Sequence, residues 1–143
     1  MLQIGDKAPL FEADSTQGPV RLQELIGRKP VVLIFYPKDE TPGCTAQLCA
    51  VRDSKRQYED AGAAVFGVNS ADVNEHKQFS EHHGLDFPII VDKDEQIRKL
   101  YDVGKILGLF LQQRIVYAID LKGNIAFAQK GSPSADKILA SLR

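Results

Sequence analysis

Two cysteines, Cys44 and Cys49, are the side chains in this sequence best suited to nucleophilic chemistry. They are the only cysteines in the chain, and they follow the stretch Thr41-Pro42-Gly43. A secreted scaffold held by disulfides would usually carry more of them. We therefore expect catalysis or redox sensing, or else two buried thiols that act only as small apolar side chains. A metal site is disfavoured, because two thiols five residues apart would need further ligands from elsewhere.

The position of Cys44 favours a reactive sulfur. We expect it in the first turn of a helix, where it meets main-chain N–H groups without internal acceptors and the positive end of the helix dipole. Both favour the thiolate, which is the nucleophilic form of cysteine. Cys49 follows on the same helix, and five residues of ideal helix separate two Cα atoms by roughly 8–9 Å. A disulfide usually needs Cα atoms within ~7 Å, so this pair can bond only if the first turns of the helix unwind.

The composition is that of an ordinary globular protein. Apolar residues make up 43% of the chain, charged residues 26%, and the formal net charge is −1. This balance gives no reason to expect a nucleic-acid partner or an anionic membrane surface. No apolar run is long enough to span a bilayer, and no leader pattern opens the sequence. We therefore expect a cytoplasmic protein with a single domain over residues 1–143.

Strands and helices are expected to alternate along most of the chain. Strands are predicted where β-branched and aromatic residues run together, and helices where apolar residues recur at helical spacing between Gly and Pro breaks. The predicted strands are 31–36, 63–70, 88–91, 116–120 and 125–129, and the predicted helices are about 45–59, 72–83, 94–101 and from 134 or 136 to 143. This order predicts an α/β fold with a central mixed β-sheet, helices on both faces and an N-terminal β-hairpin extension over residues 11–22.

The segment FYPKDETPGCTAQLC resembles the active-site segment of peroxiredoxins, whose motif is P-x-x-x-T-x-x-C. Pro37, Thr41 and Cys44 match this motif position for position, and the second cysteine, Cys49, is similar to that of the Q-type branch, also called bacterioferritin comigratory proteins. The similarity extends through the segments GDKAPLFEADS, VVLIFYP, FGVNSAD, HGLDFPIIVD and RIVYAID, and so covers nearly the whole chain. It implies a thioredoxin-like fold and thiol peroxidase activity.

The resemblance implies that both cysteines take part in the reaction. Cys44 would be the peroxidatic nucleophile, whose thiolate takes an oxygen from hydrogen peroxide or an organic hydroperoxide and becomes a sulfenic acid. Cys49 would be the resolving cysteine, which forms an intramolecular disulfide with Cys44. Thioredoxin or a similar dithiol reductant would then reduce that disulfide. We expect no cofactor, and a monomer with a weak homodimer as the alternative.

The resemblance also implies roles for four neighbours of the sulfur. Thr41 would hydrogen-bond the sulfur or the peroxide, and Pro37 would limit the access of water. Arg114 would bring a permanent positive charge to the sulfur and stabilise the charge that develops as the O–O bond breaks. The main-chain N–H group of Gly43 would help to hold the peroxide oxygens. Val116 stands where the family usually has threonine, which leaves any hydrogen bond from that position in doubt.

Three histidines and an acidic cluster receive a plainer interpretation. His76, His82 and His83 are expected to be solvated helix residues, because neighbouring residues do not share a helix face and a spacing of six is poor for metal ligands. The cluster around Asp92 lacks the spacing and glycine of a calcium loop, so a capped turn is expected there. The apolar segment from Ile106 to Leu111 is expected to pack in the core, with a peroxide-entry wall or a self-association patch as alternatives.

Two other functions stay open from the sequence. A disulfide oxidoreductase would normally show a C-x-x-C motif, which this chain lacks. A non-enzymatic redox sensor or binding module would oxidise slowly and stoichiometrically and then signal to a partner. Steady-state peroxide consumption separates both from a peroxidase.

Overall fold

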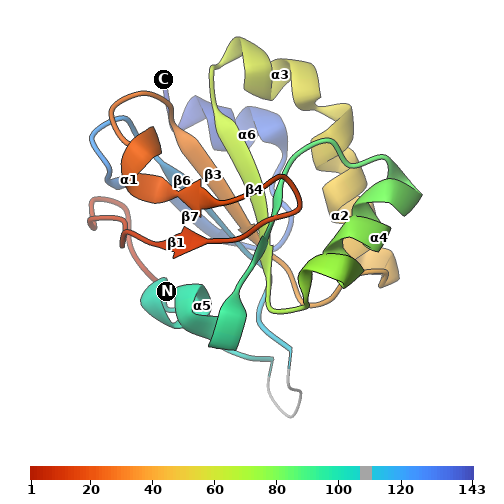
Figure 1. The fold of residues 1–143 in the computed structure, drawn as a ribbon. Coiled ribbons are helices and arrows are strands. Elements are labelled where there is room, and N and C mark those ends of the chain that lie inside the picture. The colour runs from red at the N-terminus through yellow and green to blue at the C-terminus, as the bar shows by residue number, and fades with distance from the viewer. Residues whose placement is uncertain (107–110) are drawn as a thin grey trace.

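The computed structural model describes residues 1–106 and 111–143, which form one central β-sheet with helices packed around it (Figure 1). The elements in chain order are β1 (Glu12–Ala13), β2 (Val20–Arg21), α1 (Leu22–Leu25), β3 (Val31–Phe35), α2 (Pro42–Asp53), α3 (Lys55–Asp60), β4 (Ala64–Asn69), α4 (Val73–His83), β5 (Ile89–Val91), the 3₁₀ turn η1 (Lys93–Glu95), α5 (Gln96–Leu100), β6 (Ile115–Ile119), β7 (Ile125–Lys130) and α6 (Ala135–Ala140).

The central sheet has five strands in the order β5-β4-β3-β6-β7. Strand β3 pairs in parallel with β4 and antiparallel with β6, so the sheet is mixed, as predicted. Strands β1 and β2 form a separate antiparallel hairpin, which confirms the predicted N-terminal extension. In Figure 1 this hairpin and α1 lie across one face of the sheet.

The two faces of the sheet carry separate hydrophobic clusters, because alternate residues of a strand point to opposite sides. One cluster joins Phe11 and Val20 of the N-terminal extension to Tyr101 and to one set of strand residues. The other joins the opposite set of strand residues to α2, α3, α4 and α6, and it contains Cys44. The cysteine that the sequence singled out is therefore built into the core contact between α2 and the sheet.

The structure corrects the predicted helix over residues 45–59. The helix begins earlier, at Pro42, whose fixed φ suits a first helical position. It ends at Asp53, and Ser54 separates it from α3 with φ −96° and ψ 12°. The helix predicted over 94–101 is corrected in the opposite direction. It begins two residues later, at Gln96, because Asp94 and Glu95 have left-handed φ values of 56° and 57°.

Helix α4 agrees with the prediction at both ends. The Asp72 side chain accepts a hydrogen bond from the N–H of Glu75, and Gly84 ends the helix in a left-handed conformation with φ 62°. The predicted capped turn is also confirmed: the carboxylate of Asp92 accepts from the N–H groups of Ile97 and Arg98 at the start of α5.

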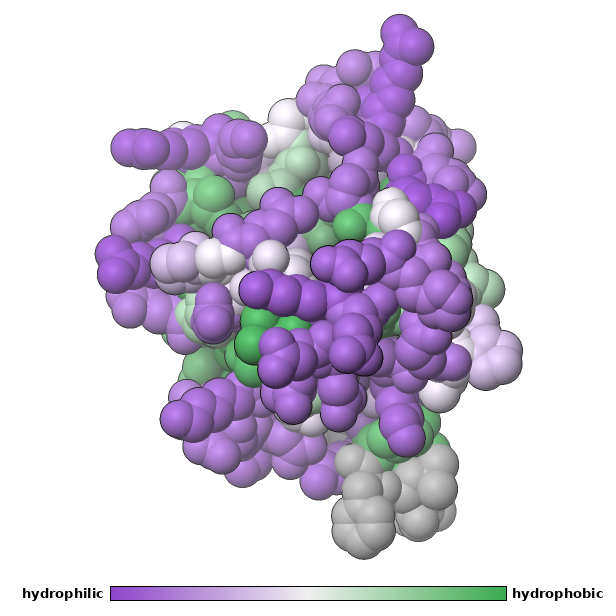
Figure 2. Space-filling view, turned by 45° about the vertical axis from the view of Figure 1, so that its right-hand side comes forward, coloured by the Kyte–Doolittle hydropathy of each residue, from purple (hydrophilic) through white to green (hydrophobic). Residues whose placement is uncertain are grey.

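The apolar segment from Ile106 to Leu111 lies largely outside the described residues, which leave out 107–110. At its base, the N–H of Ile106 donates to the carbonyl oxygen of Leu111. On the face drawn in Figure 2, hydrophilic side chains predominate and hydrophobic ones show in separate recesses between them. Among the helices of the described ranges, none combines the length and apolar character that crossing a membrane would need.

Candidate active site

Cys44 lies in the first turn of α2, at the carboxyl end of the central strand β3. The main-chain N–H groups of Gly43 and Cys44 belong to this first turn, where a helix offers no internal acceptors, so they are available to an anion or a bound oxygen. The residue is only 1% exposed, because it also belongs to the cluster between α2 and the sheet. The local sequence thus combines a shielded sulfur with the electropositive end of a helix.

Arg114 brings a positive charge to this sulfur. It comes just before β6, and the pairing of Phe35 with Ile115 sets it beside the end of β3. Its Nη2 donates to the Sγ of Cys44 over 3.3 Å. A guanidinium is always protonated, so this contact places a permanent positive charge beside the sulfur and leaves further N–H donors for a reacting oxygen.

Gly43 makes room for this contact. A Cβ atom at position 43 would lie 3.2 Å from the Nη2 of Arg114, closer than nearly all such contacts in proteins. A side chain there would push the guanidinium away from the sulfur unless the helix shifted. The glycine of the Pro-Gly-Cys sequence is therefore tied to the position of Arg114.

Gln47 is a site residue that no sequence motif indicated. It lies three residues after Cys44 on α2, hence on the same helix face, and it is buried. Its Oε1 accepts from the Nη1 of Arg114 at 2.5 Å, and its Nε2 donates to the carbonyl oxygen of Gly131 over 3.5 Å. The two ends of the guanidinium are thus held by one helix. Only the helical spacing from Cys44 could have indicated this residue.

Thr41 and Pro37 belong to the segment between β3 and α2, with Thr41 at the N-cap of α2. The Thr41 hydroxyl, expected to hydrogen-bond the sulfur or the peroxide, donates to the carbonyl oxygen of Lys38 at 2.8 Å. Its lone pairs stay available to accept from the O–H of a peroxide. The carbonyl oxygen of Pro37 accepts from the Nδ2 of Asn69, and that same nitrogen donates to the carbonyl of Tyr36. The end of β3 is therefore held by one side chain, that of Asn69, from its neighbour β4.

Cys49 lies one and a half turns further along α2, and both cysteines are free thiols. Its side chain is half-buried and packs against the same hydrophobic cluster as Cys44. The first main-chain bond of α2 runs from the N–H of Thr45 to the carbonyl oxygen of Thr41. Since α2 is a continuous helix between the two cysteines, they can form a disulfide only after its first turns open.

The structure overturns the interpretation of His76 as a solvated residue. Its side chain is completely buried. Nδ1 lies 2.7 Å from the carboxylate of Asp39, and Nε2 lies 3.1 Å from the carbonyl oxygen of Asn69. The hydroxyl of Tyr36 donates to the same carboxylate, and burial, followed by the charge of Asp39, raises the pKa of Tyr36 well above its usual value. This buried network fixes the loop before Cys44 to α4.

The interpretation of the other two histidines is also wrong in one respect. His82 and His83 are neighbours in the sequence, yet both side chains reach the carboxylate of Glu40, each over 2.9 Å. His83 is the last residue of α4, so its direction is less tied to the regular helix spacing. The rings lie 4.3 Å apart between centroids, and His82 is mostly exposed whereas His83 is not.

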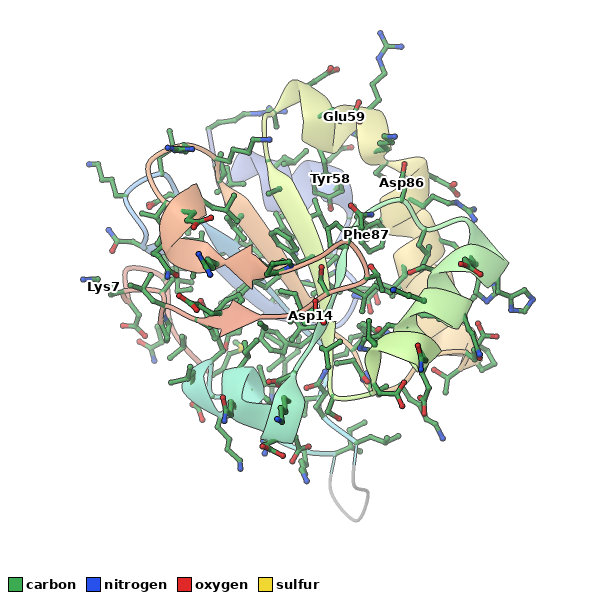
Figure 3. All side chains as sticks on the ribbon, viewed as in Figure 1. Lys7, Asp14, Tyr58, Glu59, Asp86 and Phe87 are labelled. Carbon is green, nitrogen blue, oxygen red and sulfur yellow. The ribbon has the colours of Figure 1, made fainter. Side chains whose placement is uncertain are left out.

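A surface hollow lies away from the two cysteines. It has a volume of about 240 Å³ and is lined by residues of α3 and of the segment before β5, among them Tyr58, Glu59, Asp86 and Phe87 (Figure 3). Lys55 pairs with Asp86 at its edge over 2.8 Å. Neither cysteine lines this hollow.

Comparison with known proteins identifies the family of this chain. A sequence profile described as the AhpC/TSA family matches residues 4–128, which is most of the chain. The chain belongs to the AhpC/TSA family. Its similarity to a Peroxiredoxin Q, chloroplastic, from Triticum aestivum is 41% identity over 124 residues, covering 86% of this chain and 57% of that protein. A putative peroxiredoxin bcp from Coxiella burnetii is 39% identical over 103 residues, covering 71% of this chain and 68% of that protein.

Solved structures of this family share the fold. The crystal structure of peroxidoxin BcpB from Mycobacterium tuberculosis superposes with a TM-score of 0.89 at 31% identity, covering 100% of this chain and 97% of that one. A bacterioferritin comigratory protein from Xanthomonas campestris, described with its alkyl peroxide reduction activity, gives a TM-score of 0.81 at 28% identity over 92% of this chain and 88% of that one. The resemblance to Q-type peroxiredoxins and the thioredoxin-like fold are confirmed. The chain spans a little over half the length of the plant relative, at 57%.

Proposed function

We propose that this protein is a thiol peroxidase that reduces hydroperoxides through Cys44. The thiolate attacks the terminal oxygen of the peroxide, so that an S–O bond forms while the O–O bond breaks. The leaving alkoxide or hydroxide takes up a proton and departs as alcohol or water, and Cys44 becomes a sulfenic acid. The thiol of Cys49 then condenses with the sulfenic acid, which releases water and leaves an intramolecular disulfide.

The proposal rests on one observation above all, the 3.3 Å contact between the Nη2 of Arg114 and the Sγ of Cys44. A structural thiol in an apolar core has no need of a permanent cation. A nucleophile does, because the charge lowers the cost of the thiolate and then stabilises the negative charge on the departing oxygen. The second thiol on the same helix supplies the partner for resolution.

The remaining parts of the assignment follow from the relatives and from the chemistry. We expect hydrogen peroxide and organic hydroperoxides as substrates, since the Xanthomonas protein is described with alkyl peroxide reduction activity. A thioredoxin-like dithiol is expected as the reductant, because an intramolecular disulfide is opened by thiol–disulfide exchange. A monomer and a cytoplasmic location remain predictions from the sequence.

A steady-state assay with thioredoxin, thioredoxin reductase and NADPH tests the proposal. Peroxide-dependent NADPH oxidation is expected from the wild-type protein, and Cys44→Ser should remove essentially all of it, because Cys49 lacks the contact with Arg114 that Cys44 makes. Cys49→Ser should reduce one equivalent of peroxide and then stall. Full activity of Cys44→Ser would exclude the proposed nucleophile. Disulfide exchange without peroxide consumption would instead indicate a disulfide oxidoreductase.

A further inference from the structure

Glu40, His82 and His83 form a cluster on the surface beside the loop that leads to Cys44. One carboxylate oxygen of Glu40 lies 2.9 Å from the Nδ1 of His82, and the other lies 2.9 Å from the Nε2 of His83. All three potential ligand atoms lie within 4.8 Å of one another. The peroxidase chemistry uses none of these side chains.

We propose that Glu40, His82 and His83 form a binding site for a divalent transition-metal ion of the Zn²⁺ type. Two imidazole nitrogens and one carboxylate oxygen are a donor set that suits Zn²⁺, with a fourth position open to water. Calcium and magnesium prefer sites made of oxygen ligands, which this cluster does not offer.

The distances fit such an ion after a small adjustment. In a tetrahedral zinc site with ligands at about 2.1 Å, neighbouring ligand atoms lie roughly 3.4 Å apart. Each nitrogen lies 2.9 Å from a different oxygen of Glu40, and one ligand atom from each residue lies within 4.8 Å of the other two, so side-chain rotation alone can bring three ligand atoms to this spacing.

The surroundings hold two of the three ligands in place. His83 is less exposed than His82, with 21% of its side chain accessible, and its ring packs edge-on against the buried Phe79. Glu40 has a left-handed backbone with φ 63°, which is unfavourable for a non-glycine residue. The contacts of its side chain with His82 and His83 offset this cost. The site is therefore partly organised before any ion enters.

A metal ion here would connect two parts that must separate if α2 opens. Glu40 immediately precedes Thr41 at the start of α2, whereas the two histidines end α4. An ion that binds only when these parts are together stabilises that arrangement by mass action. This consequence rests on the proposed function: the metal should slow formation of the Cys44–Cys49 disulfide.

Zn²⁺ titration of the full-length Cys44→Ser/Cys49→Ser protein, in competition with a chromophoric chelator, tests the site without interference from thiols. One equivalent should bind. His82→Asn and Glu40→Gln, each made in that protein, should weaken binding by at least about 10-fold, since even supporting residues of metal sites cost 10-fold or more. Glu75→Gln is the matched control. Glu75 lines a surface hollow together with Glu40 and His82, and its substitution removes the same negative charge as Glu40→Gln. It should change binding by no more than about twofold.

Equal weakening by Glu40→Gln and Glu75→Gln would overturn the site, because it would indicate general electrostatic attraction. Binding that His82→Asn leaves unchanged would overturn it as well. The consequence for the cycle is measured separately, as the rate of disulfide formation after a peroxide pulse. Zn²⁺ should slow this rate more in the protein with wild-type His82 than in His82→Asn, and equal slowing would contradict the link. Failure of disulfide formation without metal would count against the proposed function and not against the binding site.

Discussion

The guanidinium of Arg114 has two partners on α2, the Sγ of Cys44 and the Oε1 of Gln47. The planar guanidinium has donors in fixed directions, so it can hydrogen-bond both partners at once. The ammonium group of a lysine cannot hold the same geometry. The charge beside the sulfur is therefore fixed by α2 itself. Any change in Gln47 should reach the sulfur through Arg114.

Replacing Arg114 by glutamine should slow the reaction of the reduced protein with peroxide by about 100-fold, the usual cost of losing a donor at a developing oxyanion. Arg114→Lys keeps the charge, and its rate should fall between those of the wild type and Arg114→Gln. The measurement is the second-order rate of sulfenic acid formation under stopped flow. A rate within twofold of wild type for Arg114→Gln would show that the contact plays no part in the chemistry.

Gln47→Ala should slow the same step without removing any group that touches the peroxide, because it leaves Arg114 free to move away from the sulfur. The two residues should also be coupled. The increase in activation free energy for Arg114→Gln and Gln47→Ala together should be smaller than the sum of the two separate increases, by about 1 kcal/mol. A double-mutant cycle on the rate of peroxide reaction gives this quantity. Strict additivity would mean that Gln47 acts independently of Arg114.

The sequence predicted some of these residues and missed others for identifiable reasons. Cys44 was found from its position after Pro42 and Gly43, and Arg114 was found only through a family resemblance, since no spacing connects it to the cysteine. Gln47 and His76 were missed because burial of a polar residue depends on partners from distant elements, which a local pattern does not record. His82 and His83 were misread because a helix end does not keep the regular helical spacing.

At the level of elements, the first turns of α2 must both hold Cys44 and open. Two features make its beginning weak. Thr41 at the N-cap makes no side-chain capping bond, and Gly43 has low helix propensity. The far end is fastened more firmly, since Arg52 donates to the carbonyl oxygen of His83 in α4. Opening should therefore start at Pro42 and stop near Cys49.

A pair of exposed alanines in α2 tests this direction. Ala46 lies between the two cysteines and Ala50 lies just after the second one, and both are exposed. Alanine-to-glycine at an exposed helix position costs about 1 kcal/mol, so Ala46→Gly should speed disulfide formation by about fivefold if opening precedes it. Ala50→Gly should leave that rate nearly unchanged. Equal acceleration by both would mean that the whole helix unfolds.

The sequence predicted a helix after the cysteine loop but not its division at Ser54. No glycine or proline marks that break, and the N–H of Ser54 still finds acceptors in the carbonyl oxygens of Ala50 and Val51. The break comes from how α2 and α3 pack on the sheet, since both contribute to one cluster through Leu48 and Tyr58. Tertiary packing of this kind overrides local helix propensity.

At the level of the whole molecule, the topology was the most predictable feature. Continuous β-branched runs identified the buried strands β3 and β4, and the hairpin signal near Gly123 identified β6 and β7. The strand order could not be derived from these signals alone, because register and neighbours depend on contacts between distant segments. The family resemblance implied a thioredoxin-like fold without giving this order, and the structure shows β3 paired in parallel with β4 and antiparallel with β6.

The four tyrosines of the chain predict a loss of stability at alkaline pH. Burial raises the pKa of Tyr58 to about 12 and that of Tyr117 to about 12, and it also raises the pKa values of Tyr36 and Tyr101. In the unfolded chain these groups ionise near pH ~10. The tyrosine hydroxyls of the folded state keep their protons to higher pH, so their contribution to the free energy of unfolding is fully present below pH ~10. Above that pH the free energy of unfolding falls by about 1.4 kcal/mol per pH unit for each such tyrosine.

Far-ultraviolet circular dichroism and tyrosinate absorbance, followed together as the pH rises, measure this effect. Unfolding and tyrosine ionisation should coincide in one cooperative transition. Independent ionisation near pH ~10 with the secondary structure intact would contradict the burial of these rings.

The most direct test of the account is the state of the two cysteines after a single peroxide equivalent. Both lie in one tryptic peptide, residues 39–52, because no lysine or arginine separates them. After oxidation and alkylation, that peptide should be lighter than its reduced, unalkylated form by two hydrogens and should carry no alkyl group, which means a Cys44–Cys49 disulfide. A peptide with oxygen added to Cys44 and an alkylated Cys49 would contradict the proposed resolving step, and two alkylated cysteines would contradict peroxide reduction by Cys44.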